Sequence, residues 1–100
     1  MSYLDNLKPL SDQDVASIQE KDREYGGSWK KRGGVGAFMM LARKWDRLEK
    51  QVEAQGYDVF KAIREDQRSE GVLDDIRDLR RYLLLVEAEC HATTPVQAEK

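Results

Sequence analysis

The stretch "GAFMMLARKWDRLEKQVEAQG", Gly36–Gly56, carries the clearest structural pattern in this chain of 100 residues. Its apolar residues recur at spacings of three and four, and they are Phe38, Leu41, Ala42, Trp45, Leu48 and Val52. Because an α-helix turns once every 3.6 residues, this spacing places them on one face. The stretch therefore predicts a long helix that buries this face and stops at Gly56.

The same pattern returns near the C-terminus, in "VLDDIRDLRRYLLLVEAEC". Its apolar positions are Leu73, Ile76, Leu79, Leu83, Val86 and Cys90. This segment predicts a second long helix, which packs along the same core. Between the two, "YDVFKAIREDQRSEG" has Val59, Phe60 and Ile63 on one side and predicts a short helix that ends before Gly71.

The N-terminal part predicts one more helix, in "SDQDVASIQEKDREYG". Ser11 is the predicted N-cap, with Asp14 three residues later as a variant of the capping box, and Gly26 is the predicted C-cap. No segment alternates in the manner of a hairpin, so the fold class is all-α. We predict a bundle of three to four helices over residues 1–92, with a glycine-rich loop between the first two and a disordered tail at 93–100.

Composition limits the function classes. The net charge is −2, which gives no strong nucleic-acid signal, and one histidine with one cysteine cannot build a zinc site. No run of 18 apolar residues or signal pattern occurs, so we expect a cytoplasmic protein without a membrane partner, in a bacterial host if the chain is phage-encoded. A chain this short is marginally stable alone, which favours a homo-oligomer.

The most unusual segment is the loop "YGGSWKKRGGVGAF", from Tyr25 to Phe38. Five of the seven glycines lie in it, around Trp29 and three consecutive cations. Glycines let backbone N–H groups approach an anion at the start of a helix, and tryptophan can stack on a ring. The loop matches neither the Walker pattern nor the Rossmann fingerprint. It predicts a phosphate cradle.

Charged side chains flank the predicted buried faces. Lys44 and Arg47 follow one edge of the long central helix, and Asp46 and Glu49 follow the other. Asp75 and Asp78 share a stripe on the C-terminal helix, and antiparallel packing of the two helices would bring the four carboxylates together. Such oxygens suit Mg²⁺. Ordinary surface charges remain an open alternative, because Asp78 is also three residues from Arg81.

Three motifs, "YGGSW", "ARKWDRLE" and "GVLDDIRDLRRYLLL", resemble a family of small helical phage and bacterial proteins called nucleotide modification associated domain 1. The resemblance covers Glu24 to Glu87, at Tyr25, Gly26, Ser28, Trp29, Lys44, Arg47, Leu48, Asp74, Asp78, Leu79 and Tyr82. The helical scheme is also similar to the MazG-like nucleoside triphosphate pyrophosphohydrolases, which bind Mg²⁺ through E-x-x-E and E-x-x-D. The nearest equivalents are Asp46-x-x-Glu49 and Asp75-x-x-Asp78, in which two glutamates are replaced by aspartate.

We favour a module that binds a nucleotide or a similar phosphate ligand, for nucleotide modification or to sequester a nucleotide defence signal. The candidate ligand-binding residues are Tyr25, Gly26, Ser28, Trp29, Lys30, Lys31, Arg32, Gly33, Gly34, Lys44, Arg47 and Tyr82. One alternative is a MazG-like pyrophosphohydrolase with Mg²⁺ on Asp46, Glu49, Asp75 and Asp78. The other is a helical interaction protein without a ligand. The identity of the base, the number of phosphates and the linear or cyclic form of the ligand stay open.

Overall fold

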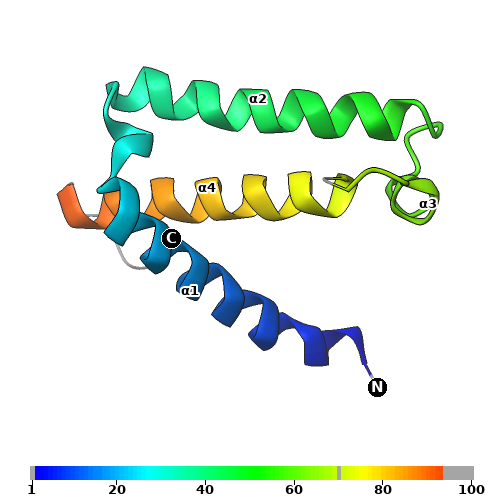
Figure 1. Ribbon diagram of the computed structural model, residues 1–100, viewed down its shortest axis with the longest axis horizontal. Helices are drawn as coiled ribbons and strands as arrows, with labels where there is room; N and C mark the ends of the chain where they lie inside the picture. The colour runs from blue at the N-terminus through cyan, green and yellow to red at the C-terminus, as the bar shows by residue number, and fades with distance from the viewer. Residues whose placement is uncertain (1, 70, 94–100) are drawn as a thin grey trace.

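The fold is all-α in a computed structural model that describes residues 2–69 and 71–93. A 3₁₀ helix, η1, spans Tyr3–Asn6, and α1 spans Leu7–Tyr25. A second 3₁₀ helix, η2, spans Ser28–Lys30 and is followed by α2 (Gly33–Glu53), α3 (Val59–Glu65) and α4 (Val72–Thr93). The described residues contain no strand, which confirms the predicted class (Figure 1). Thr93 ends α4, and the rest of the predicted tail, 94–100, lies outside the described residues.

The centre of the fold is the antiparallel pair of α2 and α4, which lie side by side along their lengths (Figure 1). The short α3 connects them at one end. Leu48 of α2, Ala62 of α3 and Val72 of α4 are buried there and form the core. Val52, Ile63, Ile76 and Leu79 pack around these three residues and extend the core. Helical periodicity therefore located the two helices that build the core. Helix α2 begins at Gly33, however, so Gly33, Gly34 and Gly36 of the predicted loop belong to its first turn.

Helix α1 begins earlier than the sequence predicted. It starts at Leu7, so Ser11 lies inside the helix and is not its N-cap. Pro9 fits the first turn, whose N–H groups have no intrahelical acceptor. The capping box lies at Ser2 instead: its hydroxyl accepts a hydrogen bond from Leu4 N, while its own N–H donates to the Asp5 carboxylate. The capping box at Ser2 therefore precedes η1, and η1 continues directly into α1.

The predicted glycine stops have different outcomes. Gly26 is the C-cap of α1, in the left-handed conformation with φ 57°, and its N–H donates to the Asp22 carbonyl. This prediction is confirmed. Helix α2 ends at Glu53, before Gly56, because the chain makes an irregular turn in which Gly56 has φ 69°. Its last predicted residues therefore belong to the connection to α3.

Much of the apolar surface is uncovered. Phe38 and Trp45, which the sequence placed on the buried face of the central helix, are 64% and 51% exposed. Leu73 and Leu83 of α4 are likewise more than half exposed. The reason is geometric: the apolar stripe on each helix is wider than the strip that one neighbouring helix can cover. A single chain buries only Ala37, Leu48, Ala62 and Val72 among its apolar residues in the described part.

Candidate functional site

A pocket of about 150 Å³ lies where α1, η2 and α4 meet. Helix α1 and the turn before η2 line one side of it, and α4 lines the other. The lining residues are Ser17, Ile18, Lys21, Asp22, Tyr25, Gly27, Ser28, Trp29, Arg81, Tyr82 and Leu85. Four of the predicted ligand-binding residues are among them, namely Tyr25, Ser28, Trp29 and Tyr82.

The backbone conformation of two glycines brings α1 and η2 together at this pocket. Gly26 and Gly27 both have positive φ, at 57° and 72°. Two consecutive left-handed residues reverse the chain at the end of α1, and residues with a side chain rarely adopt this conformation. The reversal brings Ser28 and Trp29 of η2 to the pocket beside Tyr25, the last residue of α1. Tyr82 joins them from α4, 53 residues after Trp29 (82 − 29).

The strongest polar cluster next to this pocket centres on Asp14, which is 3% exposed. Its Oδ2 accepts a hydrogen bond from Arg80 Nε, and its Oδ1 accepts from Arg80 Nη2 and from Arg81 Nε, both at 2.7 Å. Arg81 Nη1 also donates to Ser17 Oγ at 3.1 Å. The Arg80 guanidinium, bonded to both oxygens, is the main reason that the pKa of Asp14 lies below its usual range; Arg81 adds to the effect, and burial opposes it.

Sequence reasoning missed Lys21, Arg81 and the role of Asp14. Asp14 was interpreted as part of a cap, and Arg81 as a surface partner of Asp78. The one available signal was an aspartate in the interior of a helix together with the Arg80–Arg81 pair in another helix. These residues can be recognised as partners only when the relative position of α1 and α4 is known, because Asp14 is 66 and 67 residues from the two arginines.

Trp29 separates this pocket from a second, mostly apolar groove of about 490 Å³ between the start of α2 and the end of α4. Gly33, Gly34, Phe38, Leu41, Val86 and Cys90 are among its lining residues. Lys30 lines the groove too, and its Nζ is 2.7 Å from Glu89 Oε1. Lys31 and Arg32 are exposed and line neither pocket. The glycine loop is therefore divided between two sites.

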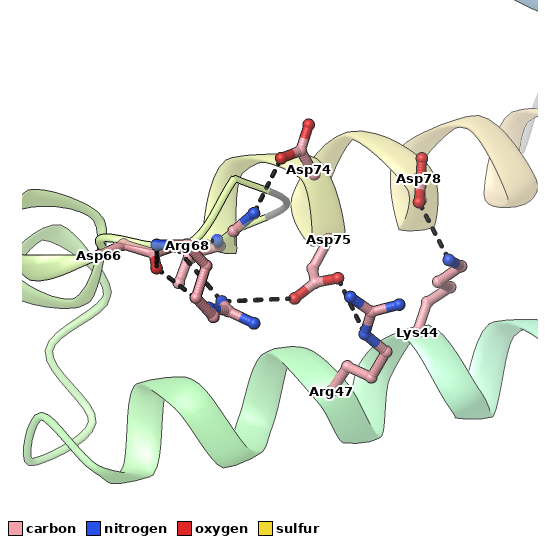
Figure 2. Close-up of polar contacts among 9 residues, drawn as sticks. Lys44, Arg47, Asp66, Arg68, Asp74, Asp75 and Asp78 are labelled. Atoms are coloured by element: carbon pink, nitrogen blue, oxygen red, sulfur yellow. Dashed lines mark hydrogen bonds and ion pairs between the residues drawn. The ribbon is translucent and has the colours of Figure 1, made fainter.

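The other predicted cations lie elsewhere, in the seam between α2 and α4 (Figure 2). Lys44 Nζ is 3.0 Å from Asp78 Oδ2, and Arg47 Nε is 3.3 Å from Asp75 Oδ1. Antiparallel packing is as predicted, but it pairs Asp75 and Asp78, the two predicted Mg²⁺ ligands of α4, with cations of α2. Arg47 is also ~20 Å along the helix from Gly33, at 1.5 Å per residue. Neither cation lines the pocket between α1, η2 and α4.

The four predicted Mg²⁺ ligands do not come together. Asp46 and Glu49 are exposed on α2, whereas Asp75 is 1% exposed inside the seam. Among residues 2–69 and 71–93, no group of three or more histidine, cysteine, aspartate or glutamate side chains is placed to hold a metal ion. Asp75 has two guanidinium groups near it, Arg47 and, at 4.0 Å, Arg68. In this arrangement the carboxylates do not fit a Mg²⁺ site.

A third polar cluster holds the start of α4. Asp66 Oδ2 accepts a hydrogen bond from Val72 N, and Asp66 Oδ1 accepts from Arg68 N and Nε at 3.2 and 3.0 Å (Figure 2). These donors, the Arg68 side chain first, lower the pKa of Asp66 to about 2. A Cβ on Gly71 would meet Asp66 Oδ2 at 2.0 Å. The glycine therefore makes room for the carboxylate that caps α4.

No family model, no curated protein and no solved structure matches this chain. Within the described residues, no helix is long and apolar enough to cross a membrane. The chemistry of the pockets is therefore the basis for a function.

Proposed function

We propose that the pocket between α1, η2 and α4 binds a nucleotide or a nucleotide-like phosphate ligand. The observation that carries this proposal is the convergence of three aromatic residues and two cations from three separate elements. Lys21 and Tyr25 come from α1, Trp29 comes from η2, and Arg81 and Tyr82 come from α4. Aromatic side chains offer stacking to a base, and a guanidinium with an ammonium offers charge to a phosphate.

The lining residues of the pocket offer two kinds of contact. Trp29, Tyr25 and Tyr82 would contact the ring, since aromatic pairs prefer stacked or edge-to-face contacts. Arg81 and Lys21 would contact the phosphate, because hydrogen bonds between ionised partners are the stronger ones. The carboxylate of Asp22 can accept a hydrogen bond from a base N–H or a sugar hydroxyl. This division predicts that ring and phosphate contacts can be removed separately by mutation.

The volume of the pocket limits the size of the ligand that it can hold. A pocket of 150 Å³ is smaller than the usual 300–1,000 Å³ of a small-molecule site, so it holds only part of a nucleotide. The exposed Lys31 and Arg32 would then attract the remaining phosphates from outside by long-range charge. The resemblance to the nucleotide modification associated domain 1 family supports the nucleotide class, and a role in phage nucleotide modification or in sequestration of a defence signal.

Binding is favoured over hydrolysis by the charge pairs in the α2–α4 seam. A MazG-like mechanism needs carboxylates that are free to hold Mg²⁺, whereas Asp75 and Asp78 are paired with Arg47 and Lys44. We therefore propose no reaction. The same pairing removes Lys44 and Arg47 from the proposed phosphate contacts.

We also propose that the protein is a homo-oligomer. A domain of this size buries too little surface to be very stable alone, and the described residues leave much apolar surface uncovered. Val35, Phe38 and Trp45 of α2, with Leu83 of α4, supply apolar surface for the contact. Light scattering that gives a monomer at high micromolar concentration would contradict this proposal.

The test of ligand binding is a thermal-shift series with nucleoside mono-, di- and triphosphates and cyclic dinucleotides, with and without Mg²⁺. A ligand at 100 times its Kd stabilises the folded state by ~2.7 kcal/mol, which shifts the midpoint by several degrees. The absence of any shift would leave the interaction protein as the better explanation.

Two pairs of variants locate the site for any ligand that shifts the midpoint. We expect Trp29→Leu to weaken binding by ~1–3 kcal/mol, the value of one stacked base, and Trp45→Leu on α2 to leave affinity unchanged. Arg81→Gln should weaken binding by ~1.5–3 kcal/mol, the range for a hydrogen bond to a charged group. Its control is Arg77→Gln, one turn earlier on the same helix and paired with Asp74. Equal losses within either pair would place the ligand elsewhere.

A further inference from the structure

We propose that Asp14 is a positioning residue for the anion-binding end of this pocket, and that it acts by holding the guanidinium of Arg81 in place. The inference rests on the proposed function and adds a residue that lines no part of the pocket itself. Asp14 lies in the interior of α1, one turn before Ser17 and two turns before Lys21 on the same helix.

The hydrogen bonds define the orientation of Arg81. Its Nε donates to Asp14 Oδ1 at 2.7 Å, and its Nη1 donates to Ser17 Oγ at 3.1 Å. A guanidinium is planar, so two directed bonds from different nitrogens determine the plane of the whole group. Among the described residues, no acceptor bonds to the two N–H groups of Nη2. The side chain is only 19% exposed and the residue lines the pocket, so these N–H groups are available to a ligand.

Arg80 keeps the cluster positive. It forms a bidentate pair with Asp14 through Nε and Nη2, so it already neutralises the carboxylate. One carboxylate shared by two guanidinium groups leaves a surplus of one positive charge. An anion that meets Arg81 therefore finds a donor that is oriented in advance and a charge that is not cancelled, which lowers the cost of ordering on binding.

The geometry also argues against a purely structural role. Fastening α1 to α4 needs one buried pair, and Arg80 supplies it with a complete two-bond fork. The additional bond from Arg81 sets the direction of a side chain that belongs to the pocket lining and still has unbonded N–H groups. If Asp14 only held α1 against α4, no fixed orientation of Arg81 would be needed.

The decisive experiment uses inorganic pyrophosphate as the probe, because it tests the anion end without a ring. In Asp14→Asn one negative charge disappears near the site, so Coulomb attraction alone would make pyrophosphate bind more tightly. A positioning role predicts the opposite. We expect calorimetry at low salt to show affinity at least tenfold weaker, with helicity by circular dichroism unchanged.

The matched control is Asp12→Asn, which deletes the same charge on the same helix, at an exposed residue paired only with Lys8. We expect its affinity to equal or slightly exceed that of the unmodified protein. A second variant, Arg81→Lys, keeps the charge but loses the fork and the bond to Asp14. It should also bind at least tenfold more weakly, and it keeps the inference testable if Asp14→Asn does not fold.

A spectroscopic signature separates positioning from general loosening. In the free protein, NMR should show the Arg81 Nε–H protected from solvent exchange, and Asp14→Asn should remove this protection while Lys21 and Trp29 keep their environments. Unchanged or tighter pyrophosphate binding by Asp14→Asn, with weaker binding by Arg81→Gln, would overturn the inference and leave the proposed function intact. Failure of the unmodified protein to bind pyrophosphate or any nucleotide would overturn both.

Discussion

Asp14 and Asp75, the two most buried carboxylates among the described residues, have different partners. Asp14 is 3% exposed and accepts three hydrogen bonds from two arginines. Asp75 is 1% exposed, yet its Oδ1 lies 3.3 Å from Arg47 Nε, and its Oδ2, 4.0 Å from Arg68 Nη2, accepts no hydrogen bond from the described residues. A buried charge is costly unless it is paired and hydrogen-bonded. The free energy of unfolding should therefore depend on Asp14 far more than on Asp75.

The two carboxylates also differ in the net charge around them. At Asp14 two guanidinium groups surround one carboxylate, and one of them lines a pocket. In the seam, Arg47 and Lys44 face Asp75 and Asp78, so the charges cancel within the protein. A surplus of positive charge beside a cavity is what the proposed anion site requires, whereas the balanced charges of the seam serve the contact between helices.

The largest expected effect is the loss of stability in Asp14→Ala. This change removes the partner of both Arg80 and Arg81, and breaking a buried pair costs ~3–5 kcal/mol. The partial exposure of Arg80, at 37%, favours the lower end of that range. Urea unfolding measures the loss. Asp12→Ala, which breaks only the exposed pair with Lys8, should change stability by less than ~1 kcal/mol. Similar losses in the two variants would remove the distinction between them.

The next effect concerns the cap of α4. Gly71→Ala places a Cβ where the Asp66 carboxylate now lies, 2.0 Å from its Oδ2, so the cap has to move and Val72 N loses its acceptor. We expect a clear fall in the urea midpoint, smaller than that of Asp14→Ala. Gly34→Ala is the control: its added Cβ would meet no atom within 4 Å, and it should stabilise the helix by ~0.4–1 kcal/mol. A fall in both would mean that steric crowding at Gly71 is not the cause.

Acid should weaken both aspartate clusters that have lowered pKa values. The pKa values of Asp14 and Asp66 are lower in the folded state than in the unfolded chain, so the unfolded state takes up protons first as the pH falls. The stability that Asp66 contributes is complete above pH ~4 and is lost as the pH falls toward its folded pKa of about 2, and the contribution of Asp14 is also lost below the pKa of an unfolded aspartate. In Asp66→Asn the slope of stability against pH over this interval should become shallower. Urea unfolding at a series of pH values gives the slope, and an unchanged slope would contradict the Asp66 assignment.

The smallest effect should come from Asp75→Asn. The exchange removes the buried charge of a carboxylate whose Oδ2 accepts no hydrogen bond from the described residues. It also weakens the ion pair with Arg47, whose side chain is 47% exposed. The saving in desolvation offsets the lost attraction, so we expect a change within ~1 kcal/mol by urea unfolding. Asp14→Asn measured alongside should cost clearly more. An Asp75→Asn loss as large as that of Asp14→Asn would show that the seam is as well satisfied as the α1–α4 cluster.

Local patterns in the sequence anticipated the elements but not their exposed faces. The periodicity from Phe38 to Val52 located α2 correctly, because residues three and four apart share a face in any helix. It could not show that Phe38 and Trp45 stay uncovered, since burial depends on the width of the neighbouring helix. Gly26 was found as a C-cap because a left-handed residue favours glycine on its own, without help from the rest of the fold.

The candidate site likewise contains residues that the sequence predicted and residues that it did not. The family resemblance brought Tyr25, Ser28, Trp29 and Tyr82 into one predicted site, and the structure places all four around one pocket. The same prediction added Lys44 and Arg47, which lie in the seam. Lys21 and Arg81 were missed because nothing near them in the chain distinguishes them from other surface cations.

By itself, the sequence determined the all-α class, the positions of the long helices and the reversal after α1, since each follows from interactions within a few residues. Only the tertiary structure decided which cation meets which carboxylate. That choice follows from the angle and register between helices, and these are set by the packing of side chains such as Leu48, Ala62 and Val72 from three elements. Asp14 therefore meets Arg80 and Arg81, and Asp75 meets Arg47, although all of these residues look alike as members of charged helical faces.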